Sequence, residues 1–190
     1  MRRGKKATKT SRRYPGSLVL INGLPGSGKS TFAGALADAL GFPLFSKDAY
    51  KESLWPGSVP PDAAASLALG RRALRRLWAD VAAEPGPAVV ESFWFARRDR
   101  DFVLSDLAAA RRMANLELWC DVDPATARQR CRSRVRHPVH HPVHEDDVLW
   151  AEWAGNAGPL DLGPVLQVDT ARPVDVPALS REVGQLLGPD

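Results

Sequence analysis

Short apolar runs alternate along the chain with longer stretches in which apolar residues recur every three or four positions. The short runs have the length and composition of buried strands, and they span residues 17–22, 43–46, 88–92, 116–120 and 165–168. The longer stretches have the spacing of amphipathic helices, and they span residues 29–40, 62–81, 99–113, 123–136 and 175–187. Strands that alternate with helices in this way predict an α/β fold, in which helices cover both faces of a parallel sheet.

The turn between the first strand and the first helix carries the pattern G-x-x-x-x-G-K-[ST]. Its residues are Gly23, Leu24, Pro25, Gly26, Ser27, Gly28, Lys29, Ser30 and Thr31. The glycines allow backbone N–H groups to close around a polyphosphate, and the helix that follows adds its positive N-terminal end. We expect Lys29 to reach the β- and γ-phosphates and the Ser30 hydroxyl to bind Mg²⁺. The position between a strand and a helix supports the motif, so the sequence predicts binding of a nucleoside triphosphate.

The net charge of +4 comes from one end of the chain. Residues 1–16 carry seven Lys or Arg and no acidic residue, which leaves 19 basic and 22 acidic residues in the rest, a net charge of −3. We therefore expect a disordered basic tail over residues 1–16 and one folded domain over residues 17–190. Two interpretations of the tail remain open: a solvated segment, or a contact with the phosphate backbone of a nucleic acid.

Composition narrows the setting in which the protein works. No apolar run approaches the ~20 residues of a membrane-spanning helix, so no membrane contact is expected. The basic N-terminus is not followed by the apolar segment of a secretory signal. Cys120 and Cys131 form no C-x-x-C pair and lie in a predicted strand and a predicted helix. We expect buried free thiols and a cytoplasmic location.

Asp48 follows the second predicted strand. In doubly wound sheets, ligands bind outside the carboxyl ends of the strands, which is where this residue is expected. A carboxylate there can take the proton of a hydroxyl group as it attacks the γ-phosphate. The alternative is that Asp48 only caps a helix over residues 49–54. From the residues alone, the two roles are equally favoured.

The phosphate-binding loop together with Lys47-Asp48-Ala49-Tyr50-Lys51 resembles the polynucleotide kinase branch of the small P-loop kinases. The wider group also includes zeta-toxin-like, chloramphenicol and gluconate kinases. The resemblance implies a P-loop NTPase fold, a three-layer sandwich with a five-stranded, mostly parallel sheet and an Arg-rich lid. It also implies ATP and Mg²⁺ as cofactors and Asp48 as the general base. Lys51 stands where the family often has arginine, near the acceptor, and Lys cannot make the same bidentate phosphate contact.

Five arginines alternate with other residues after the fourth strand: Arg128, Arg130, Arg132, Arg134 and Arg136. Arg130 and Arg134 are four residues apart, so on a helix they share one face. The resemblance implies that such a pair forms a lid, whose guanidinium groups neutralise the charge that develops in phosphoryl transfer. The alternative is a solvated basic face, which suits Arg128 and Arg132 better than the pair.

Further candidates follow the third strand. Glu91 ends this strand, and we expect it to hold Mg²⁺ through water, with Ser92 as a polar neighbour. For the aromatic run Phe93-Trp94-Phe95, packing in the core is favoured over stacking against an acceptor. Arg97 and Arg98 either reach an acceptor phosphate or lie at the surface.

The resemblance also implies that adenine rests on residues 168–173, with Thr170, Arg172 and Pro173 as positional candidates. All four histidines lie in the duplicated tract His-Pro-Val-His over residues 137–144. The prolines oppose a helical arrangement of ligands. We therefore favour an extended loop at the tip of the lid over a zinc site.

The sequence therefore predicts a cytoplasmic, Mg²⁺- and ATP-dependent kinase that phosphorylates a hydroxyl group. Asp48 accepts the proton, Lys29 holds the phosphates, and Arg130 with Arg134 closes over them. Two classes of acceptor remain open, a polynucleotide 5′-hydroxyl and a small molecule. The rival hypothesis is a nucleotide-gated module that binds nucleic acid through residues 1–16.

Overall fold

The computed structural model describes residues 14–55, 57, 62–135, 137–140 and 146–188. Its strands are β1 (Leu18–Asn22), β2 (Leu44–Ser46), β3 (Ala88–Glu91), β4 (Leu116–Asp121) and β5 (Val165–Asp169). Its helices are α2 (Lys29–Leu40), α3 (Lys47–Ser53), α4 (Ala63–Ala83), α5 (Ala96–Ala109), α6 (Pro124–Ser133), α7 (Asp147–Gly155) and α8 (Val176–Leu187). None of the helices in these ranges is long and apolar enough to cross a membrane.

The strands form one parallel sheet with the order β2-β3-β1-β4-β5. β1 lies at the centre, where Leu20 pairs with Val90 of β3 and with Glu117 of β4. Every residue of β1 is buried, as expected for a parallel strand covered on both faces. The predicted α/β, P-loop NTPase-like fold is confirmed, and the sheet is entirely parallel.

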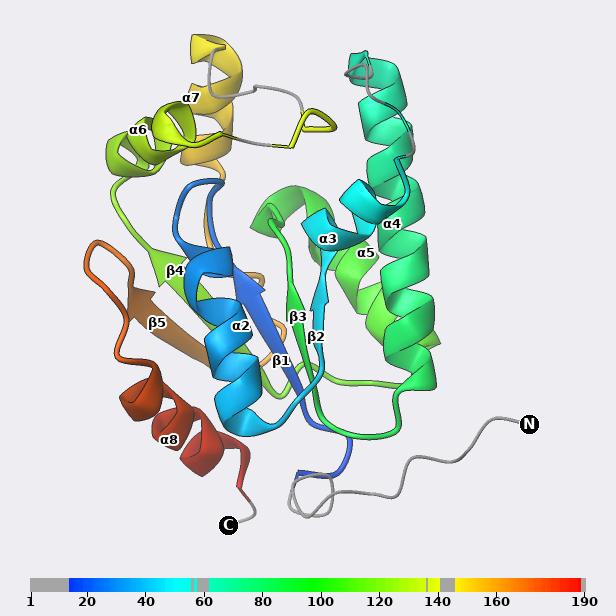
Figure 1. Cartoon of the computed structure of the whole chain (residues 1–190). Coiled ribbons are helices and arrows are strands. Elements are labelled where there is room, and N and C mark those ends of the chain that lie inside the picture. The colour runs from blue at the N-terminus through cyan, green and yellow to red at the C-terminus, as the bar shows by residue number, and fades with distance from the viewer. Residues whose placement is uncertain (1–13, 56, 58–61, 136, 141–145, 189–190) are drawn as a thin grey trace.

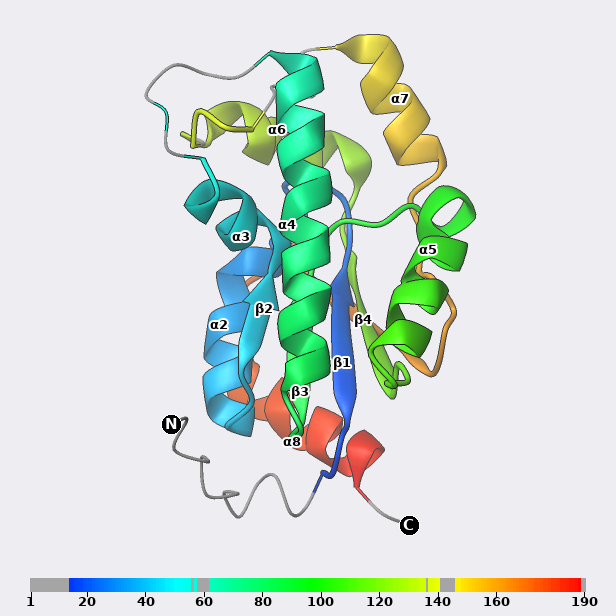
Figure 2. The same cartoon turned by 90° about the vertical axis from the view of Figure 1, so that its right-hand side faces the viewer.

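Helices cover both faces of the sheet because alternate residues of β1 point to opposite sides. Val19 and Ile21 belong to a core cluster with residues of α2 and α8. Leu18 and Leu20 belong to a second cluster with residues of α4 and α5. Figure 2 shows α2 and α5 on opposite sides of the sheet. The result is the three-layer arrangement in which both clusters exclude water from the central strand.

The carboxyl ends of the parallel strands meet at one end of the molecule (Figure 1, top). The loop between β1 and α2, the short helix α3 and the pair α6 and α7 gather around this end. Ligands of open α/β sheets bind in this position. The fold therefore brings together segments that are far apart in the sequence.

Helices α5, α6 and α7 differ from what the sequence pattern predicted. α5 spans Ala96–Ala109 instead of residues 99–113, and the positive φ of 55° at Arg111 takes the chain out of helical geometry. α6 ends at Ser133, and Arg134 has an extended backbone with φ −95° and ψ 128°. α7 was not predicted; its start is fixed by Asp146, whose side chain accepts a hydrogen bond from the Leu149 N–H.

The folded part of the chain begins earlier than predicted. Tyr14, which the sequence pattern assigned to the tail, is only 7% exposed. Its ring packs edge-on against Phe42 at a centroid distance of 5.7 Å, and its hydroxyl donates to the Gly184 carbonyl. Residues 1–13 lie outside the described residues, so the disordered basic tail stays a prediction there.

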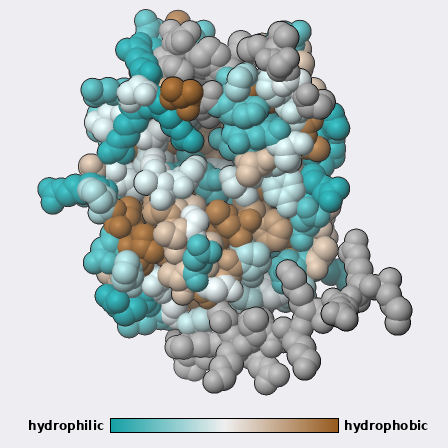
Figure 3. Space-filling model, in the orientation of Figure 1, coloured by the Kyte–Doolittle hydropathy of each residue, from teal (hydrophilic) through white to brown (hydrophobic). Residues whose placement is uncertain are grey.

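The surface gives no sign of an extended apolar contact area on the face shown in Figure 3. Hydrophilic side chains predominate on it, and hydrophobic ones form small, separate areas. The large apolar residues that are exposed come from different elements, including Leu67 of α4, Phe102 of α5 and Leu186 of α8. Dispersed exposed residues of this kind are normal for a soluble surface.

Candidate active site

A cavity of about 1060 Å³ lies at the carboxyl end of the sheet. Its walls come from the β1–α2 loop, α3, the start of α4, the end of β3, α6, α7 and the segment after β5. The residues predicted as catalytic, as metal ligands or as the adenine contact all line it: Lys29, Ser30, Asp48, Glu91, Arg130, Arg134 and Thr170. One cavity thus collects residues from segments that are far apart in the sequence.

The β1–α2 loop owes its path to glycines at positions where a side chain would not fit. Gly26 has φ 80°, and a Cβ there would lie 2.1 Å from the Ala127 carbonyl oxygen of α6. Gly28, with φ 93°, is the N-cap of α2. A positive φ is strained for residues other than glycine. The loop is therefore pressed against α6, with its N–H groups and the N-terminus of α2 at the cavity.

Lys29 is buried and closes the loop on itself. Its ammonium group donates to the carbonyl oxygens of Gly23 and Leu24 at 2.7 and 2.9 Å. Burial lowers the pKa of Lys29, and the negative charge of Glu91 opposes that shift. A buried cation favours an anionic partner. Polyphosphate oxygens are suitable partners, since Lys29 lines the cavity.

Ser30 and Glu91 form an oxygen-rich corner beside Lys29. The Ser30 hydroxyl donates to Glu91 Oε1 at 2.9 Å, and the Ser46 hydroxyl donates to Oε2 at 2.5 Å. Mg²⁺ takes oxygen ligands and is usually held by one or two protein groups together with water and phosphates. In the described ranges, no cluster of three His, Cys, Asp or Glu offers an all-protein metal site. The Ser30–Glu91 pair fits a magnesium ion that is shared with a nucleotide.

Two buried residues that the sequence pattern did not single out hold the loop from behind. Asn22 Oδ1 accepts hydrogen bonds from the N–H groups of Gly23 and Trp94, and its amide donates to Glu117. Glu117 also accepts from the N–H groups of Leu160 and Asp161. Burial raises the pKa of Glu117, and these hydrogen bonds act against that shift. The sign of this role in the sequence was a charged residue, Glu117, within an otherwise apolar strand.

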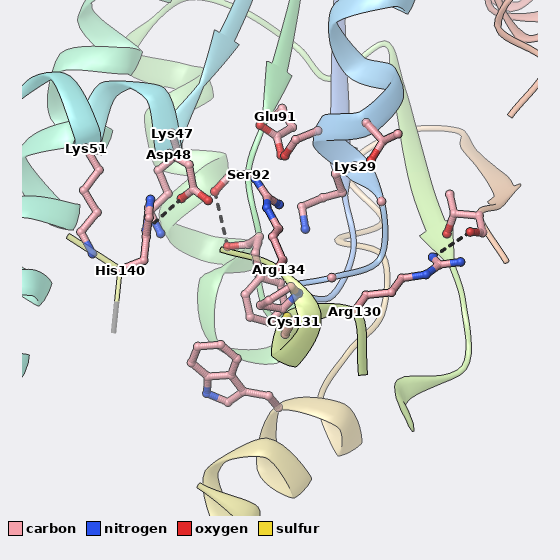
Figure 4. Close-up of a pocket in the computed structure, with 18 of the residues that line it drawn as sticks. Lys29, Lys47, Asp48, Lys51, Glu91, Ser92, Arg130, Cys131, Arg134 and His140 are labelled. Carbon is pink, nitrogen blue, oxygen red and sulfur yellow. Dashed lines mark hydrogen bonds and ion pairs between the residues drawn. The ribbon is translucent and has the colours of Figure 1, made fainter. Parts of the chain in front are cut away.

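Asp48 lies at the second position of α3, with its carboxylate at the cavity. Its alternative role as the cap of a helix over residues 49–54 is wrong, because α3 begins at Lys47 and Ser46 is its N-cap. The Asp48 side chain is 46% exposed. The carboxylate is therefore accessible to a ligand, on the side of the cavity away from Arg130 (Figure 4).

The two predicted lid arginines do not share a helix face. Arg130 lies on α6 and turns toward the end of β5, where it donates to the carbonyl oxygens of Thr170 and Ala171 at 2.9 and 3.1 Å. Arg134 follows the end of α6. Its side chain extends into the space between Asp48 and Lys29 (Figure 4). The extended backbone at Arg134 breaks the i, i+4 relation and separates the two guanidinium groups.

The remaining arginines of this segment also separate. Arg128 pairs with Asp147 of α7 and lies over the Trp150 ring at 5.8 Å. Arg132 is exposed and does not line the cavity. Arg136 lies outside the described residues. The described arginines of the predicted lid thus have different surroundings, and a uniform solvated basic face does not describe them.

The segment 137–140 reaches across the cavity from α6 to the helices α3 and α4. Val139 is buried, and its carbonyl oxygen accepts from the Ser66 hydroxyl of α4 at 3.0 Å. Ser66 in turn accepts from the buried ammonium of Lys51 at 2.7 Å. His140 approaches two carboxylates of α3, those of Asp48 and Glu52. The predicted lid-tip loop is thus docked on α3 and α4 over residues 137–140, and His141 and His144 lie outside the described residues.

The aromatic run after β3 divides between core and cavity. Trp94 is buried in the core cluster of α4 and α5. Phe93 and Phe95 line the cavity and form an aromatic cluster with Trp153 of α7. Arg98 lies 4.1 Å over the Phe95 ring and pairs with Asp99 through both carboxylate oxygens. Ser92 also lines the cavity, whereas Arg97 is exposed and does not.

The segment after β5 forms the far wall of the cavity. Thr170 is buried, and its N–H and hydroxyl both donate to the Asp121 carbonyl. Arg172 and Pro173 also line this wall. Thr170 lies opposite Gly28, since a Cβ at Gly28 would be 3.6 Å from the Thr170 Cβ. This wall is therefore next to the phosphate-binding loop, where a nucleotide base would extend from its phosphates.

Both cysteines are buried free thiols, as predicted. Cys120 lies in β4 behind the phosphate-binding loop, and burial raises the pKa of its thiol to about 12. Cys131 of α6 lines the cavity, and a Cβ at Gly26 would lie 2.9 Å from its sulfur. The two thiols serve as small packing residues around the loop.

Comparison with known proteins places the chain in a family. A family model described as "AAA domain" matches residues 18–152. The chain belongs to this AAA domain family. No curated protein sequence matches the chain. The family match covers the phosphate-binding loop, α3, β3 and the arginine-rich helix, so it includes most of the cavity wall.

Several solved structures similar to this AAA domain protein are described as kinases. A protein from Chloroflexus aurantiacus j-10-fl, provisionally described as a kinase, is 27% identical with a TM-score of 0.75, over 90% of this chain and 98% of that chain. A gluconokinase from Sinorhizobium meliloti 1021 is 23% identical with a TM-score of 0.56, over 93% of both chains. A shikimate kinase from Acinetobacter baumannii, in complex with shikimate, is 15% identical with a TM-score of 0.55, over 94% and 96%. The last two show the likeness of fold alone.

Proposed function

We propose that the protein transfers the γ-phosphoryl group of ATP to a hydroxyl group of a small molecule. The observation that carries the proposal is a single cavity whose wall includes both the phosphate-binding Lys29 and the carboxylate of Asp48. The similarity to the kinase-like protein from Chloroflexus aurantiacus supports the same class of reaction. A phosphate site joined to a base by open space is the arrangement that direct transfer needs.

On the nucleotide side, the loop N–H groups and Lys29 hold the β- and γ-phosphates. In doing so, Lys29 exchanges its bonds to the Gly23 and Leu24 carbonyls for phosphate oxygens. Ser30 and Glu91 would hold Mg²⁺, which neutralises charge on the phosphates. Thr170 and the residues after it form the wall beside the base. Arg130 steadies this wall through its bonds to the Thr170 and Ala171 carbonyls.

On the acceptor side, Asp48 takes the proton of the attacking hydroxyl group. The oxygen of the acceptor forms a bond to the γ-phosphorus as the bond to the ADP oxygen breaks. Arg134 lies between Asp48 and Lys29 (Figure 4), where its positive charge counters the charge on the transferring group. Positioning and electrostatics are the main contributions of protein groups to this reaction.

A small acceptor suits the cavity better than a polynucleotide. The segment 137–140 docks on α3 and α4 and covers the acceptor side, with Val139 fully buried. The body of the protein, without residues 1–16, carries a net charge of −3, which opposes binding of a polyanion. Two neighbours of similar fold are described as a gluconokinase and a shikimate kinase in complex with shikimate. Both names refer to small molecules that carry hydroxyl groups.

A transfer screen tests the proposal. Purified protein is incubated with Mg²⁺ and ATP labelled at the γ-phosphate, against sugars, sugar acids, aminocyclitols, nucleosides and oligonucleotides with a free 5′-hydroxyl. The expected result is label on a small molecule, absent with Lys29→Ala. Label on oligonucleotides alone would replace the proposed acceptor with a polynucleotide, and no label on any acceptor would overturn the kinase proposal.

The rival hypothesis, a nucleotide-gated module that binds nucleic acid through the basic tail, has its own test. Tyr14 is part of the core, so the deletion should remove residues 1–13 and leave Tyr14 in place. A small-molecule kinase keeps its turnover within about 2-fold, since every described residue that lines the cavity remains. Loss of turnover together with loss of oligonucleotide binding would favour the rival.

A further inference from the structure

His140 lies between two carboxylates of α3 at the edge of the cavity. Its Nε2 is 2.9 Å from Glu52 Oε1, and its Nδ1 is 3.9 Å from Asp48 Oδ1 (Figure 4). The imidazole is only 7% exposed, whereas the two carboxylates are 41% and 46% exposed. The hydrogen bond to Glu52 makes Nε2 the donor, so the neutral ring presents Nδ1 without a proton toward Asp48.

The backbone around His140 fixes this orientation. The His140 N–H donates to the His137 carbonyl, and the Ser66 hydroxyl donates to the Val139 carbonyl. Val139 is fully buried. His137 packs its ring against Trp55 at a centroid distance of 5.4 Å, and its Nδ1 accepts from the Val139 N–H at 3.3 Å. The segment therefore presents one of its two described histidines to Asp48 and the other to an aromatic side chain.

The charged groups around the imidazole come from three elements. α3 contributes Asp48, Glu52 and Lys51; Lys51 donates to Ser66 of α4. Arg134 precedes the segment and shares the cavity. Within the segment, the His137 ring lies 6.4 Å from the His140 ring. The two groups nearest to the ring nitrogens are carboxylates, and these favour a positive charge on the ring once a proton arrives.

We propose that His140 is a positioning residue that receives, at Nδ1, the proton that Asp48 takes from the acceptor. The proposal rests on the kinase function proposed above. When the acceptor oxygen bonds to phosphorus, its proton moves to an Asp48 oxygen. From there it moves to His140 Nδ1, which restores the Asp48 carboxylate and leaves an imidazolium paired with Glu52. The proton passes to water as the product leaves, and the neutral ring is restored.

The separation of 3.9 Å is longer than a hydrogen bond, and it closes when a ligand orders Asp48. Hydrogen bonds between catalytic groups are often long before the substrate binds. Here the mobile partner is the half-exposed carboxylate, because the imidazole is buried and anchored at Nε2. An imidazole is a stronger base than a carboxylate, so transfer from a protonated Asp48 to neutral His140 runs downhill.

The coupling of the two residues can be measured on the full chain without any substrate. Imidazole ¹⁵N NMR over pH 5–8 reports the tautomer and the titration midpoint of each histidine. We expect the Nε2–H tautomer for neutral His140. Its midpoint should fall by about one pH unit in Asp48→Asn, since a neighbouring negative charge is lost, and fall also in Glu52→Gln. His137→Gln is the matched control and leaves the midpoint unchanged. A midpoint that Asp48→Asn does not move overturns the proposal.

The pH profile of turnover separates this role from a structural one. Steady-state transfer from Mg²⁺-ATP to the acceptor selected in the screen is measured from pH 5 to 8. In the wild type, kcat falls as the pH is lowered, because a protonated ring cannot receive the proton. His140→Gln should lower kcat by roughly 10-fold and remove the dependence of kcat on pH. This loss is smaller than the ~10²-fold minimum expected for loss of Asp48, the base itself. His137→Gln keeps the wild-type profile.

Two failures are distinguishable. A uniform loss in His140→Gln with an unchanged pH profile means a structural role and overturns the inference alone. Wild-type protein that turns over no ATP, with water or with any acceptor of the screen, overturns the proposed function whatever the NMR coupling of His140.

Discussion

The two halves of the cavity are built differently. The phosphate side is formed by nine consecutive residues, which include the buried Lys29, together with the buried Glu91, and the geometry of the loop follows from its backbone conformation. The acceptor side is formed by single side chains from α3, α4, the end of α6 and segment 137–140, and Asp48 there is half-exposed. In the proposed reaction, the pre-formed, buried phosphate side recognises the phosphate groups of ATP, which all kinase reactions share. A half assembled from separate side chains can differ between acceptors.

Loss of the phosphate half should have the largest effect. Lys29→Ala removes the buried ammonium that lies at the cavity, and we expect transfer to become undetectable. The folded state should persist, because the substitution removes a buried charge and leaves the glycines of the loop in place. Circular dichroism and labelled-ATP transfer measure the two properties. A folded variant with near-normal turnover would show that the loop does not hold the reacting phosphates.

Loss of the base should spare the phosphate half. Asp48→Asn keeps the size of the side chain but cannot accept the proton, so kcat should fall by about 10² to 10⁴. Affinity for ATP, measured by calorimetry, should change little. Asp175→Ala is the control, since Asp175 is a true N-cap whose side chain accepts from the Ala178 N–H. It should cost about 1 kcal/mol of stability with turnover intact. If Asp48→Asn instead lost about 1 kcal/mol of stability and kept its turnover, Asp48 would have a structural role only.

Substitution of Arg134 and of Arg130 should distinguish the two sides of the cavity, because each changes a different kinetic constant. Arg134→Ala should lower kcat and kcat/KM together by about 10²-fold, as expected for a group that acts on the transferring phosphoryl. Arg130 instead contacts carbonyl oxygens after β5. Arg130→Ala should therefore mainly raise the KM for ATP, by severalfold. Arg132→Ala, at an exposed position, is the matched control. Equal losses at all three positions would indicate a diffuse basic surface.

The smallest expected effect concerns the hydrogen bond that joins α3, the helix that carries Asp48, to α4. The Tyr50 hydroxyl of α3 donates to Asp80 of α4 at 2.8 Å. Burial, together with this hydrogen bond, raises the pKa of Tyr50 to about 12. The folded state therefore keeps the phenol protonated where the unfolded chain releases the proton. Stability from this source is present below about pH 10 and is lost as the pH rises toward 12.

Tyr50→Phe tests that attachment. At pH 7 the substitution should lower the free energy of unfolding by about 0.5 kcal/mol. The value is modest because Asp80 is partly exposed. The gap between wild type and variant should narrow between pH 10 and 11, since only the wild type has a phenol to titrate here. Urea unfolding at the two pH values measures it. A gap that widens with pH would contradict the assigned cause.

The sequence predicted the position of the β1–α2 loop and of Glu91, because the information for both is local. Nine adjacent residues, with a strand before them and a helix after them, determine the loop, and Glu91 follows from the end of a neighbouring strand. Asn22 and Glu117 were missed because their hydrogen bonds join β1 to β4 and to the loop at Leu160. A glutamate in an apolar strand was a usable sign of such a bond.

The acceptor half was predicted less well because its geometry depends on tertiary contacts. The spacing of Arg130 and Arg134 indicated one helix face, but the helix ends at Ser133. The chain then crosses to α4, where Val139 is buried. Four histidines in two identical repeats gave no reason to select His140. Among the two histidines that the structure describes, His140 differs from His137 by its docking beside Glu52 and Asp48.

The central claim is that the two halves work together, so that phosphate leaves ATP only to reach an acceptor hydroxyl. The most direct measurement is the ratio of phosphorylated acceptor to ADP formed by the wild-type protein, with the acceptor selected in the screen and γ-labelled ATP. The account predicts one phosphorylated acceptor for each ADP, with the label in an ester of the acceptor hydroxyl. ADP formation with the label only in inorganic phosphate, across the whole panel of acceptors, would contradict it.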